Sequence, residues 1–360
     1  MKIFLTGGTG FLGSHVARLL RERGDEVSAL VRNPGKAVEL RSIGCEIVEG
    51  DLVDADVLSR ATIGCDAVVH GAAVFEVGIP ARERRRMAEA NIRGTRNICQ
   101  AALQADVPRL VHVSTVGVFG NTRGALAHEE SRHPGEYRTY YEWTKYHGHA
   151  VVRRYIGIGL PAVIVLPSTI YGPGDTSQIG QLVRLFLDGR APQMLFPDTC
   201  GFSLVHVEDV ARGILLALEN GQAGDEYILG GEIATMRALM RRVAELAGKP
   251  VPEAAAPAWF LRHVLPHLPP LAAALGFPPN VREAVAGLDG YTWWASHEKA
   301  IRELGYESRR LDVGLADMLA REGRLSATPE PVVSLPGAEQ PAPVVRETAE
   351  RHVGAGSSSG

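Results

Sequence analysis

The sequence has little cysteine, no excess of basic residues and no long uncharged apolar run. Its four cysteines, among 360 residues, are scattered without a C-x-x-C pair. This scatter argues against structural zinc and against a disulfide framework, and it is typical of a reducing compartment, so we expect a cytoplasmic location. The formal net charge of −3 gives nucleic acid no electrostatic reason to bind.

No segment reaches the length of uncharged apolar sequence that a membrane-spanning helix needs. The nearest one, residues 254–279, contains Arg262 and is interrupted by prolines. No charged leader precedes an apolar stretch at the start of the chain, so secretion is not expected.

Metal-ligand spacing is also missing. The best histidine pairs are His147 with His149, only two residues apart, and His263 with His267, which Pro266 separates. We expect surface or packing roles for these four side chains, and no metal site.

Short apolar runs alternate with helical periods through the first half of the chain. The runs predict strands at residues 2–6, 26–31, 45–49, 67–70, 109–114 and 162–166. The helical periods between them cover residues 10–23, 36–43, 55–61, 82–105 and 140–156. Continuous apolar strands between helices indicate an α/β fold, a doubly wound parallel sheet of the Rossmann type with both faces covered.

A glycine-rich turn follows the first strand directly. Its residues are Gly7, Gly8, Thr9, Gly10, Phe11, Leu12 and Gly13. Glycine allows the tight turn, lets a pyrophosphate approach bare backbone and lets the helix lie close to the strand. Two spacings fit, G-x-G-x-x-G from Gly8 and G-x-x-G-x-x-G from Gly7, and each indicates a different group of enzymes. After a strand and before a helix, such a turn predicts a phosphate site at a helix N-terminus, although an ordinary strand-to-helix turn is the alternative.

Regularity weakens after Pro167, where proline, glycine and aromatic residues become frequent. We predict a dinucleotide-binding domain at residues 1–166 and 202–231, in which strands at 204–207 and 226–229 return to the parallel sheet. A smaller, discontinuous substrate domain would comprise residues 167–201 and 232–325. Residues 326–360, rich in Pro, Ala, Glu and Ser, lack an apolar period and are predicted to be disordered.

A tyrosine and a lysine share one face of the helix predicted at 140–156. Tyr141 and Lys145 are four residues apart, so the ammonium can lie near the phenol and favour its ionised form. A phenol becomes a usable acid or base near neutral pH only with such help. A hydroxyl at Ser114 or Thr115, at the end of a strand, would hold a substrate oxygen beside that phenol. Taken alone, the pair is also common on solvated helix surfaces.

The sequence resembles a known family, the extended short-chain dehydrogenases/reductases of the NAD-dependent epimerase/dehydratase superfamily. The resemblance covers about residues 1–230 and is closest to the dihydroflavonol reductase and 3β-hydroxysteroid dehydrogenase branch. The matching segments follow the family's order: 6–13, 50–52, 70–73, 91–95, 114–115, Tyr141 with Lys145, 167–173 and 205–210.

The resemblance implies a role for each matching residue. Tyr141 would be the proton donor or acceptor, Lys145 would lower its pKa and hold the nicotinamide ribose, and Thr115 rather than Ser114 would be the catalytic hydroxyl. Asn91 would support the central helix near the site, or else cap the helical turn that follows it. The remaining cofactor contacts implied are Asp51 and Leu52 at the adenine, Gly71, Ala72 and Ala73 beneath the cofactor, and Ser114, Pro167, Ser168, Thr169 and Ile170.

The residues after the second strand bear on the choice of cofactor. NAD usually needs a carboxylate there for the ribose hydroxyls, whereas NADP uses an arginine for its 2′-phosphate. The strand at 26–31 is followed by Arg32 and soon by Lys36. NADP(H) is therefore favoured over NAD, unless Arg32 is simply a solvated cation.

The substrate is indicated by two departures from the sugar-nucleotide members of the resembled family. Phe202 stands where those members carry an arginine that pairs with the substrate diphosphate, although Arg184 or Arg190 can substitute. The segment from Trp259 to Phe277 is mainly apolar, and it would pack a core, line the pocket for a lipophilic or aromatic substrate, or rest on a membrane surface.

We therefore predict an NADP(H)-dependent oxidoreductase that interconverts a ketone and a secondary alcohol. A nucleotide-sugar epimerase or dehydratase with tightly bound NAD(P) is the alternative, and a cofactor-sensing protein on the same fold is disfavoured by the intact Thr115, Tyr141 and Lys145. The resemblance also implies a homodimer through the helices at 82–105 and 140–156.

Overall fold

A computed structural model describes residues 1–325, apart from 191–193, 196–199, 252–253, 256, 258, 275–276 and 287–289. The disorder predicted at 326–360 lies outside the described residues. The described residues all belong to one compact unit.

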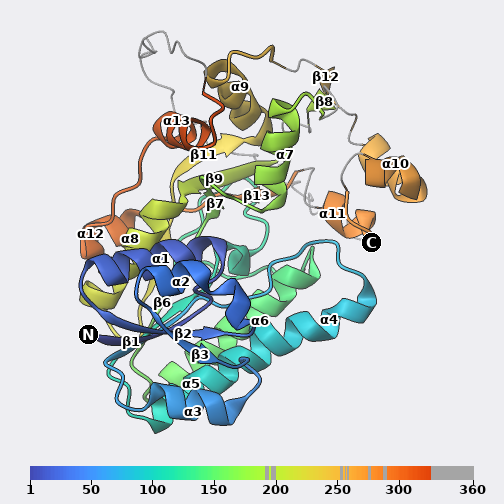
Figure 1. The fold of residues 1–360 in the computed structure, drawn as a ribbon. Helices are drawn as coiled ribbons and strands as arrows, with labels where there is room; N and C mark the ends of the chain where they lie inside the picture. The colour runs from blue at the N-terminus through green and yellow to red at the C-terminus, as the bar shows by residue number, and fades with distance from the viewer. Residues whose placement is uncertain are drawn as a thin grey trace, which may run out of the picture. The chain divides into compact units, whose positions relative to one another are not determined.

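Seven parallel strands form the main sheet (Figure 1), as the alternation of strands and helices predicted. Their order is β3-β2-β1-β4-β5-β6-β10, so the chain winds outward in one direction from β1 and in the other from β4. The crevice at the carboxyl ends of β1 and β4 is where such sheets bind their ligands. The strands are β1 (Lys2–Thr6), β2 (Glu26–Val31), β3 (Glu46–Glu49), β4 (Ala67–His70), β5 (Leu110–Val113), β6 (Ala162–Pro167) and β10 (Glu226–Leu229).

Helices cover both faces of this sheet, each through its own apolar core. One face is covered by α1 (Phe11–Glu22), α2 (Val38–Ser42), α8 (Val207–Asn220) and α12 (Glu298–Leu304). The other is covered by α3 (Ala55–Thr62), α5 (Thr95–Gln104) and α6 (Tyr140–Ile156). Burial on both faces explains why the strands are continuous apolar runs.

The single helix expected at residues 82–105 is interrupted. It consists of α4 (Ala81–Ala88), a π-helical turn at Glu89–Gly94, and α5. At this turn the Asn91 carbonyl accepts a hydrogen bond from the Thr95 hydroxyl at 2.8 Å. Gly148 of α6 packs so closely that a Cβ there would lie 2.4 Å from that carbonyl oxygen. The wider turn lies where two helices meet, a common position for such bulges near functional sites.

A second sheet is built around β9 (Gly201–His206), which pairs with β7 (Thr169–Tyr171), β11 (Glu232–Thr235) and β13 (Thr292–Trp293). The strand expected at 204–207 was predicted to join the main sheet, and this prediction is wrong. β7 follows β6 immediately and offers β9 a parallel partner outside the main sheet, and β10 then takes the position beside β6. The division into a cofactor and a substrate domain stays a prediction.

The second sheet packs against α7 (Gln178–Leu187), α9 (Met236–Leu246) and α13 (Leu311–Arg321). Phe202 lies in this core, with its ring stacked on Trp293 at a centroid distance of 5.3 Å. A short pair joins β8 (Met194–Leu195) to β12 (Ala254–Ala255).

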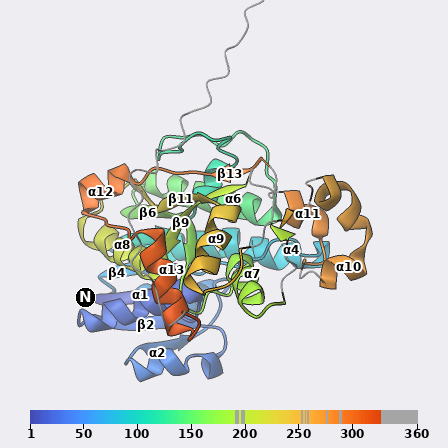
Figure 2. The same ribbon diagram turned by 90° about the horizontal axis from the view of Figure 1, so that it is seen from above.

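The apolar segment after β12 forms short, interrupted helices, among them α10 (Pro269–Ala274) and α11 (Val281–Ala286), which lie to one side of the sheets (Figure 2). Glu283 of α11 lies 3.7 Å from Arg84 of α4. They have an apolar cluster of their own around Leu265, so part of this segment packs a core. Trp259 is 62% exposed. Among the described residues, none of the helices combines the length and apolarity that crossing a membrane would require.

Candidate active site

The glycine turn joins β1 to α1 at the crevice between β1 and β4. Gly7 has φ +84°, and its carbonyl oxygen accepts a hydrogen bond from the Gly10 N–H at 2.9 Å. A Cβ on Gly13 would lie 2.0 Å from that oxygen, and a Cβ on Gly7 would lie 2.7 Å from the Ala72 nitrogen. Helix α1 then begins with no side-chain cap and no acidic residue in its first turn. The backbone N–H groups in the first turn of α1 therefore have no side-chain cap, and they fit a pyrophosphate.

The other predicted cofactor residues follow the carboxyl ends of neighbouring strands. Gly71 follows β4, where its N–H donates to the Thr6 carbonyl at 3.1 Å. Asp51 is half-buried after β3, and Leu52 is buried beneath Gly94. Pro167 is the last residue of β6, and residues 168–170 follow it. The Ser168 hydroxyl is buried and has no hydrogen-bond partner among the described residues. The sheet therefore gathers these segments at one edge.

Arg32 and Lys36 are both exposed just past β2. Neither side chain makes a hydrogen bond or ion pair within the described part of the chain. The Asn33 side chain between them accepts from the Gly35 N–H at 3.0 Å, which fixes the turn that carries Lys36. Asp25, at the other end of β2, is occupied by Arg23 at 2.6 Å. The surface just past β2 is therefore cationic.

Tyr141 and Lys145 lie on α6, as their spacing predicted. The Lys145 Nζ donates to the Val113 carbonyl at the end of β5, at 3.0 Å. Burial lowers the pKa of Lys145 to about 8. Burial also raises the pKa of Tyr141, so the phenol is protonated at neutral pH. The expected lowering of the phenol pKa by Lys145 is thus not what the structure shows, because desolvation dominates.

Ser114 and Thr115 directly follow β5, and their hydroxyls have different partners. The Ser114 hydroxyl is buried and lies 3.0 Å from His149 Nδ1, and His149 Nε2 lies 3.3 Å from Glu226. Thr115 is half-buried, and its oxygen accepts from the Gly117 N–H at 3.2 Å. The Thr115 hydroxyl proton is therefore still available to a substrate oxygen, whereas the Ser114 hydroxyl is occupied inside the core.

Asn91 is buried and does not act as a helix N-cap. Its Nδ2 donates to the Val74 carbonyl at 3.0 Å and to the Thr144 hydroxyl at 2.9 Å, while its Oδ1 accepts from the Val74 N–H at 2.8 Å. These bonds occupy the amide with protein partners. Asn91 therefore supports α6 and the segment after β4, and direct cofactor contact by its side chain is not favoured.

A model of the NAD dependent epimerase/dehydratase family matches residues 3–230. The chain belongs to this family. Its fold and its homologues make it an enzyme of the extended short-chain dehydrogenase/reductase group, which is NAD(P)-dependent and acts on CH–OH groups.

Three relatives illustrate the range of this epimerase/dehydratase family. A 4-hydroxy-2-methyl-3-oxo-4-farnesyl-3,4-dihydroquinoline-1-oxide ketoreductase of Stigmatella aurantiaca is 33% identical, over 86% of this chain and 92% of its own. A 3 beta-hydroxysteroid dehydrogenase/Delta 5→4-isomerase of Mycobacterium tuberculosis is 28% identical, over 85% and 86%. A dTDP-glucose 4,6-dehydratase of Streptomyces venezuelae, solved with NAD bound, is 29% identical with TM-score 0.73, over 90% and 98%.

Apolar side chains surround the Tyr141 ring. Phe75, on the segment after β4, contacts it edge to face at a centroid distance of 4.8 Å and is itself 54% exposed. Tyr141 also packs against an apolar cluster of the buried side chains Val74, Ile79 and Met87. Phe75 and this cluster form an apolar surface around the Tyr141 ring, which we call the apolar wall.

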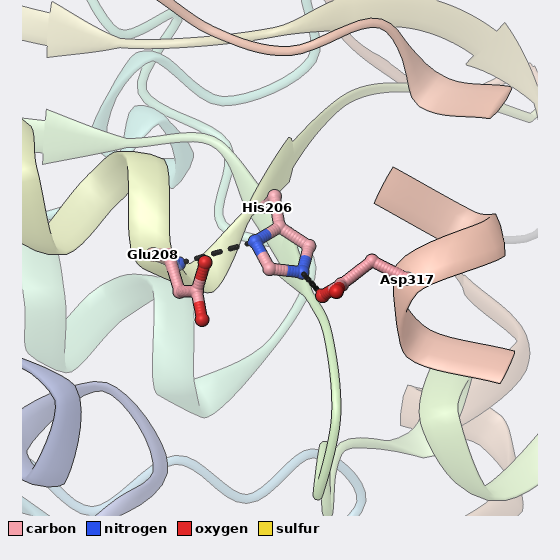
Figure 3. A group of neighbouring side chains, drawn as sticks. All are labelled: His206, Glu208 and Asp317. Carbon is pink, nitrogen blue, oxygen red and sulfur yellow. Dashed lines mark hydrogen bonds and ion pairs between the residues drawn. The ribbon is translucent and has the colours of Figure 1, made fainter. Parts of the chain in front are cut away.

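One group of side chains has the composition of a metal site. His206, Glu208 and Asp317 converge between α8 and α13 (Figure 3). His206 Nδ1 accepts from the Glu208 N–H at 3.3 Å, and Arg321 contacts both Glu208, at 2.8 Å, and Asp317, at 3.0 Å. Arg309 also contacts Glu208 at 3.1 Å. Two guanidinium groups already neutralise the carboxylates, so we assign this group a structural role.

Some residues near the site were not singled out from the sequence. Phe75 follows an otherwise matched segment, and only its place in the fold brings it to Tyr141. His70 stands at the head of the matched segment 70–73, which was the available signal, but only the three residues after it were given a role. Its partners Thr6 and Thr95 come from distant positions of the chain.

Proposed function

We propose that the protein reduces a ketone to a secondary alcohol with NADPH, on a small lipophilic or aromatic substrate. The apolar wall around the Tyr141 phenol supports this proposal most directly, because an exposed Phe75 beside a catalytic phenol suits an apolar ligand. Relatives named as a farnesyl-quinoline ketoreductase and a hydroxysteroid dehydrogenase agree with it.

A sugar-nucleotide substrate, the alternative, is disfavoured because position 202 carries a phenylalanine and not a cation that could pair with a diphosphate. The Phe202 ring is buried against Trp293 in the core of the second sheet. Arg184 already pairs with Glu322 at 3.5 Å and donates to the Asp175 carbonyl. These contacts leave Phe202 and Arg184 poorly suited to a diphosphate, and the exposed Arg190 is the remaining cation of the two that the sequence offered.

The glycine turn would hold the pyrophosphate on the first turn of α1, and Arg32 with Lys36 would hold the 2′-phosphate. Bound NADPH supplies the hydride. Thr115 would donate a hydrogen bond to the substrate carbonyl oxygen, and Tyr141, kept protonated by burial, would transfer the single proton that this oxygen needs as the carbonyl carbon receives the hydride. Lys145 remains a fixed cation behind the site through its bond to Val113.

A panel of lipophilic ketones tests the function, each assayed with NADPH and with NADH. We expect NADPH oxidation with at least one cyclic or aryl ketone, and a kcat/KM with NADH lower by about tenfold or more, because a 2′-phosphate paired with arginine is a charge-assisted contact. Equal use of NADH would contradict the cofactor assignment. Turnover of a sugar nucleotide without added cofactor would contradict the reaction.

The cofactor preference is tested with Arg32→Ala, and Arg41→Ala is the matched control. Arg41 lies on α2 and donates to the Pro34 carbonyl at 2.6 Å. Only the first variant should lose the preference for NADPH.

The pH profile of the reduction follows from Lys145. Its folded-state pKa of about 8 lies below the ordinary 10.5, so the ammonium is charged below pH 8 and is lost as the pH rises through that value. We expect kcat/KM for reduction to decrease above about pH 8. Residual activity of Lys145→Arg should lack this decrease, because the guanidinium keeps its charge. A flat wild-type profile to pH 9.5 would refute the role of the ammonium.

A homodimer through α4, α5 and α6 and a cytoplasmic location both stay predictions. The outer surface of α6 carries a row of rings that includes Tyr140 stacked on Trp143 at 5.2 Å, which suits such an interface.

A further inference from the structure

A chain of buried hydrogen bonds links the ends of β1 and β4 to the start of α5, next to the crevice between β1 and β4. Thr6, the last residue of β1, lies 2.7 Å from His70 Nδ1, and His70 is the last residue of β4. On the other side of the ring, His70 Nε2 lies 3.1 Å from the Thr95 hydroxyl. Thr6, His70 and Thr95 are each at most 1% exposed, so water does not compete for these bonds.

Only one arrangement of protons satisfies every member of this chain. The Thr95 hydroxyl donates to the Asn91 carbonyl at 2.8 Å, so it must accept from His70 Nε2–H. His70 Nδ1 then carries no proton and accepts from the Thr6 hydroxyl. The Thr6 oxygen in turn accepts from the Ala72 N–H at 3.3 Å. Each hydroxyl therefore donates once and accepts once, and the imidazole is held as its neutral Nε2–H form.

The environment of the ring keeps it neutral. Burial lowers the pKa of His70 to about 3, with the nearby Lys145 ammonium acting in the same direction. His112 packs against the ring at a centroid distance of 5.2 Å, and burial also lowers its pKa. With Lys145 and His112 as the titratable groups facing it, His70 does not titrate near neutral pH.

The chain continues from Asn91 to the catalytic helix. Asn91 Nδ2 donates to the Thr144 hydroxyl at 2.9 Å, and that hydroxyl donates to the Tyr141 carbonyl at 2.8 Å. The same amide holds Val74, next to Phe75. The end of β1, the segment after β4 and the first turn of α6 are therefore joined through one imidazole.

We propose that His70 is a positioning residue that fixes the first turn of α6, and with it the Tyr141 phenol, relative to the cofactor crevice. Its Nε2–H holds the Thr95 and Asn91 pair in the π-helical turn, and this pair holds Thr144. The inference deepens the proposed function and rests on it where turnover is the readout. A displacement of about 1 Å at the phenol is enough to slow a reaction by orders of magnitude.

The test compares four variants: His70→Phe, His70→Gln, His70→Asn and His112→Phe. Phenylalanine keeps the volume of the ring and removes both bonds. A glutamine amide reaches the position of Nε2 and can still donate to Thr95, whereas an asparagine amide reaches only the Thr6 side. His112 has a similarly buried ring on the adjacent strand, and its Nδ1 has no hydrogen-bond partner among the described residues, so His112→Phe controls for the loss of a buried imidazole.

We expect His70→Phe and His70→Asn to lower kcat by about tenfold or more while the NADPH dissociation constant, from protein fluorescence, changes by less than about threefold. His70→Gln should recover most of kcat, and His112→Phe should keep it. Equal kcat losses in the glutamine and asparagine variants, or in His112→Phe, would reduce His70 to a packing role and overturn the proposal.

Hydrogen exchange at residues 139–146 separates this inference from the proposed function. With NADPH bound, these amides should exchange at least about threefold faster in the phenylalanine and asparagine variants than in the wild type, because the turn loses its support. If the wild type reduces no ketone but the variants still show this difference in exchange, the proposed reaction is refuted and the positioning role is kept. Unchanged exchange in every variant would overturn the positioning role.

Discussion

Replacing Tyr141 by phenylalanine is expected to lower kcat for ketone reduction by about 10²–10⁴-fold, because the reaction loses its proton donor. Cofactor binding and folding should be nearly unaffected. The Tyr141 hydroxyl has no hydrogen-bond partner among the described residues, and the ring keeps its edge-to-face contact with Phe75 at 4.8 Å. Steady-state kinetics with NADPH, together with a fluorescence titration of the cofactor, measures both effects.

Tyr140→Phe is the matched control for this variant. Tyr140 is the preceding residue, and its ring stacks on Trp143. It should keep wild-type turnover. Substantial activity in Tyr141→Phe would refute the assignment of the phenol, and equal losses in both variants would indicate damage to the helix instead.

Replacing Gly13 by alanine is expected to remove most of the cofactor affinity, raising the NADPH dissociation constant by at least about tenfold. The added Cβ would lie 2.0 Å from the Gly7 carbonyl oxygen and 3.0 Å from the Gly8 Cα, so α1 must move away from the turn. Such overpacking costs about 1–3 kcal/mol of unfolding free energy as well. Isothermal titration and denaturant unfolding measure the two losses.

Gly157→Ala controls for the loss of a glycine at a helix end. Gly157 has right-handed helical angles, and a Cβ there would find its nearest neighbour at 3.4 Å, an ordinary contact. We expect unchanged affinity for this variant. If Gly13→Ala binds NADPH as tightly as the wild type, the glycine turn does not hold the pyrophosphate.

Local patterns were sufficient to predict most of the cofactor half. Helix α6 covers Tyr140–Ile156, as its period indicated, and β2 covers Glu26–Val31. The glycine turn was found because strand, turn and helix each have a signature within a few residues. The parallel order of the sheet follows from that alternation, since each crossover needs a helix.

Features that depend on distant partners were not accessible in the same way. The apolar run that forms β9 is compatible with either sheet. It pairs in the second sheet with β7, a strand too short to be predicted. The π-helical turn at Asn91 depends on the close approach of Gly148 from α6. Burial determines the direction of the Tyr141 pKa, and burial is a property of the whole fold that a four-residue spacing does not contain.

The second sheet has a consequence for how the chain acquires its structure during synthesis. Its central strand β9 pairs with β13, whose residues Thr292–Trp293 are translated long after the crevice around β1 and β4 is complete. Because contacts between distant segments form late, nascent chains would pair β1 with β4 before β13 is available to complete the second sheet. Truncated translation products that end before Thr292 should therefore leave the Gly201–Phe202 end of β9 without its partner strand on that side.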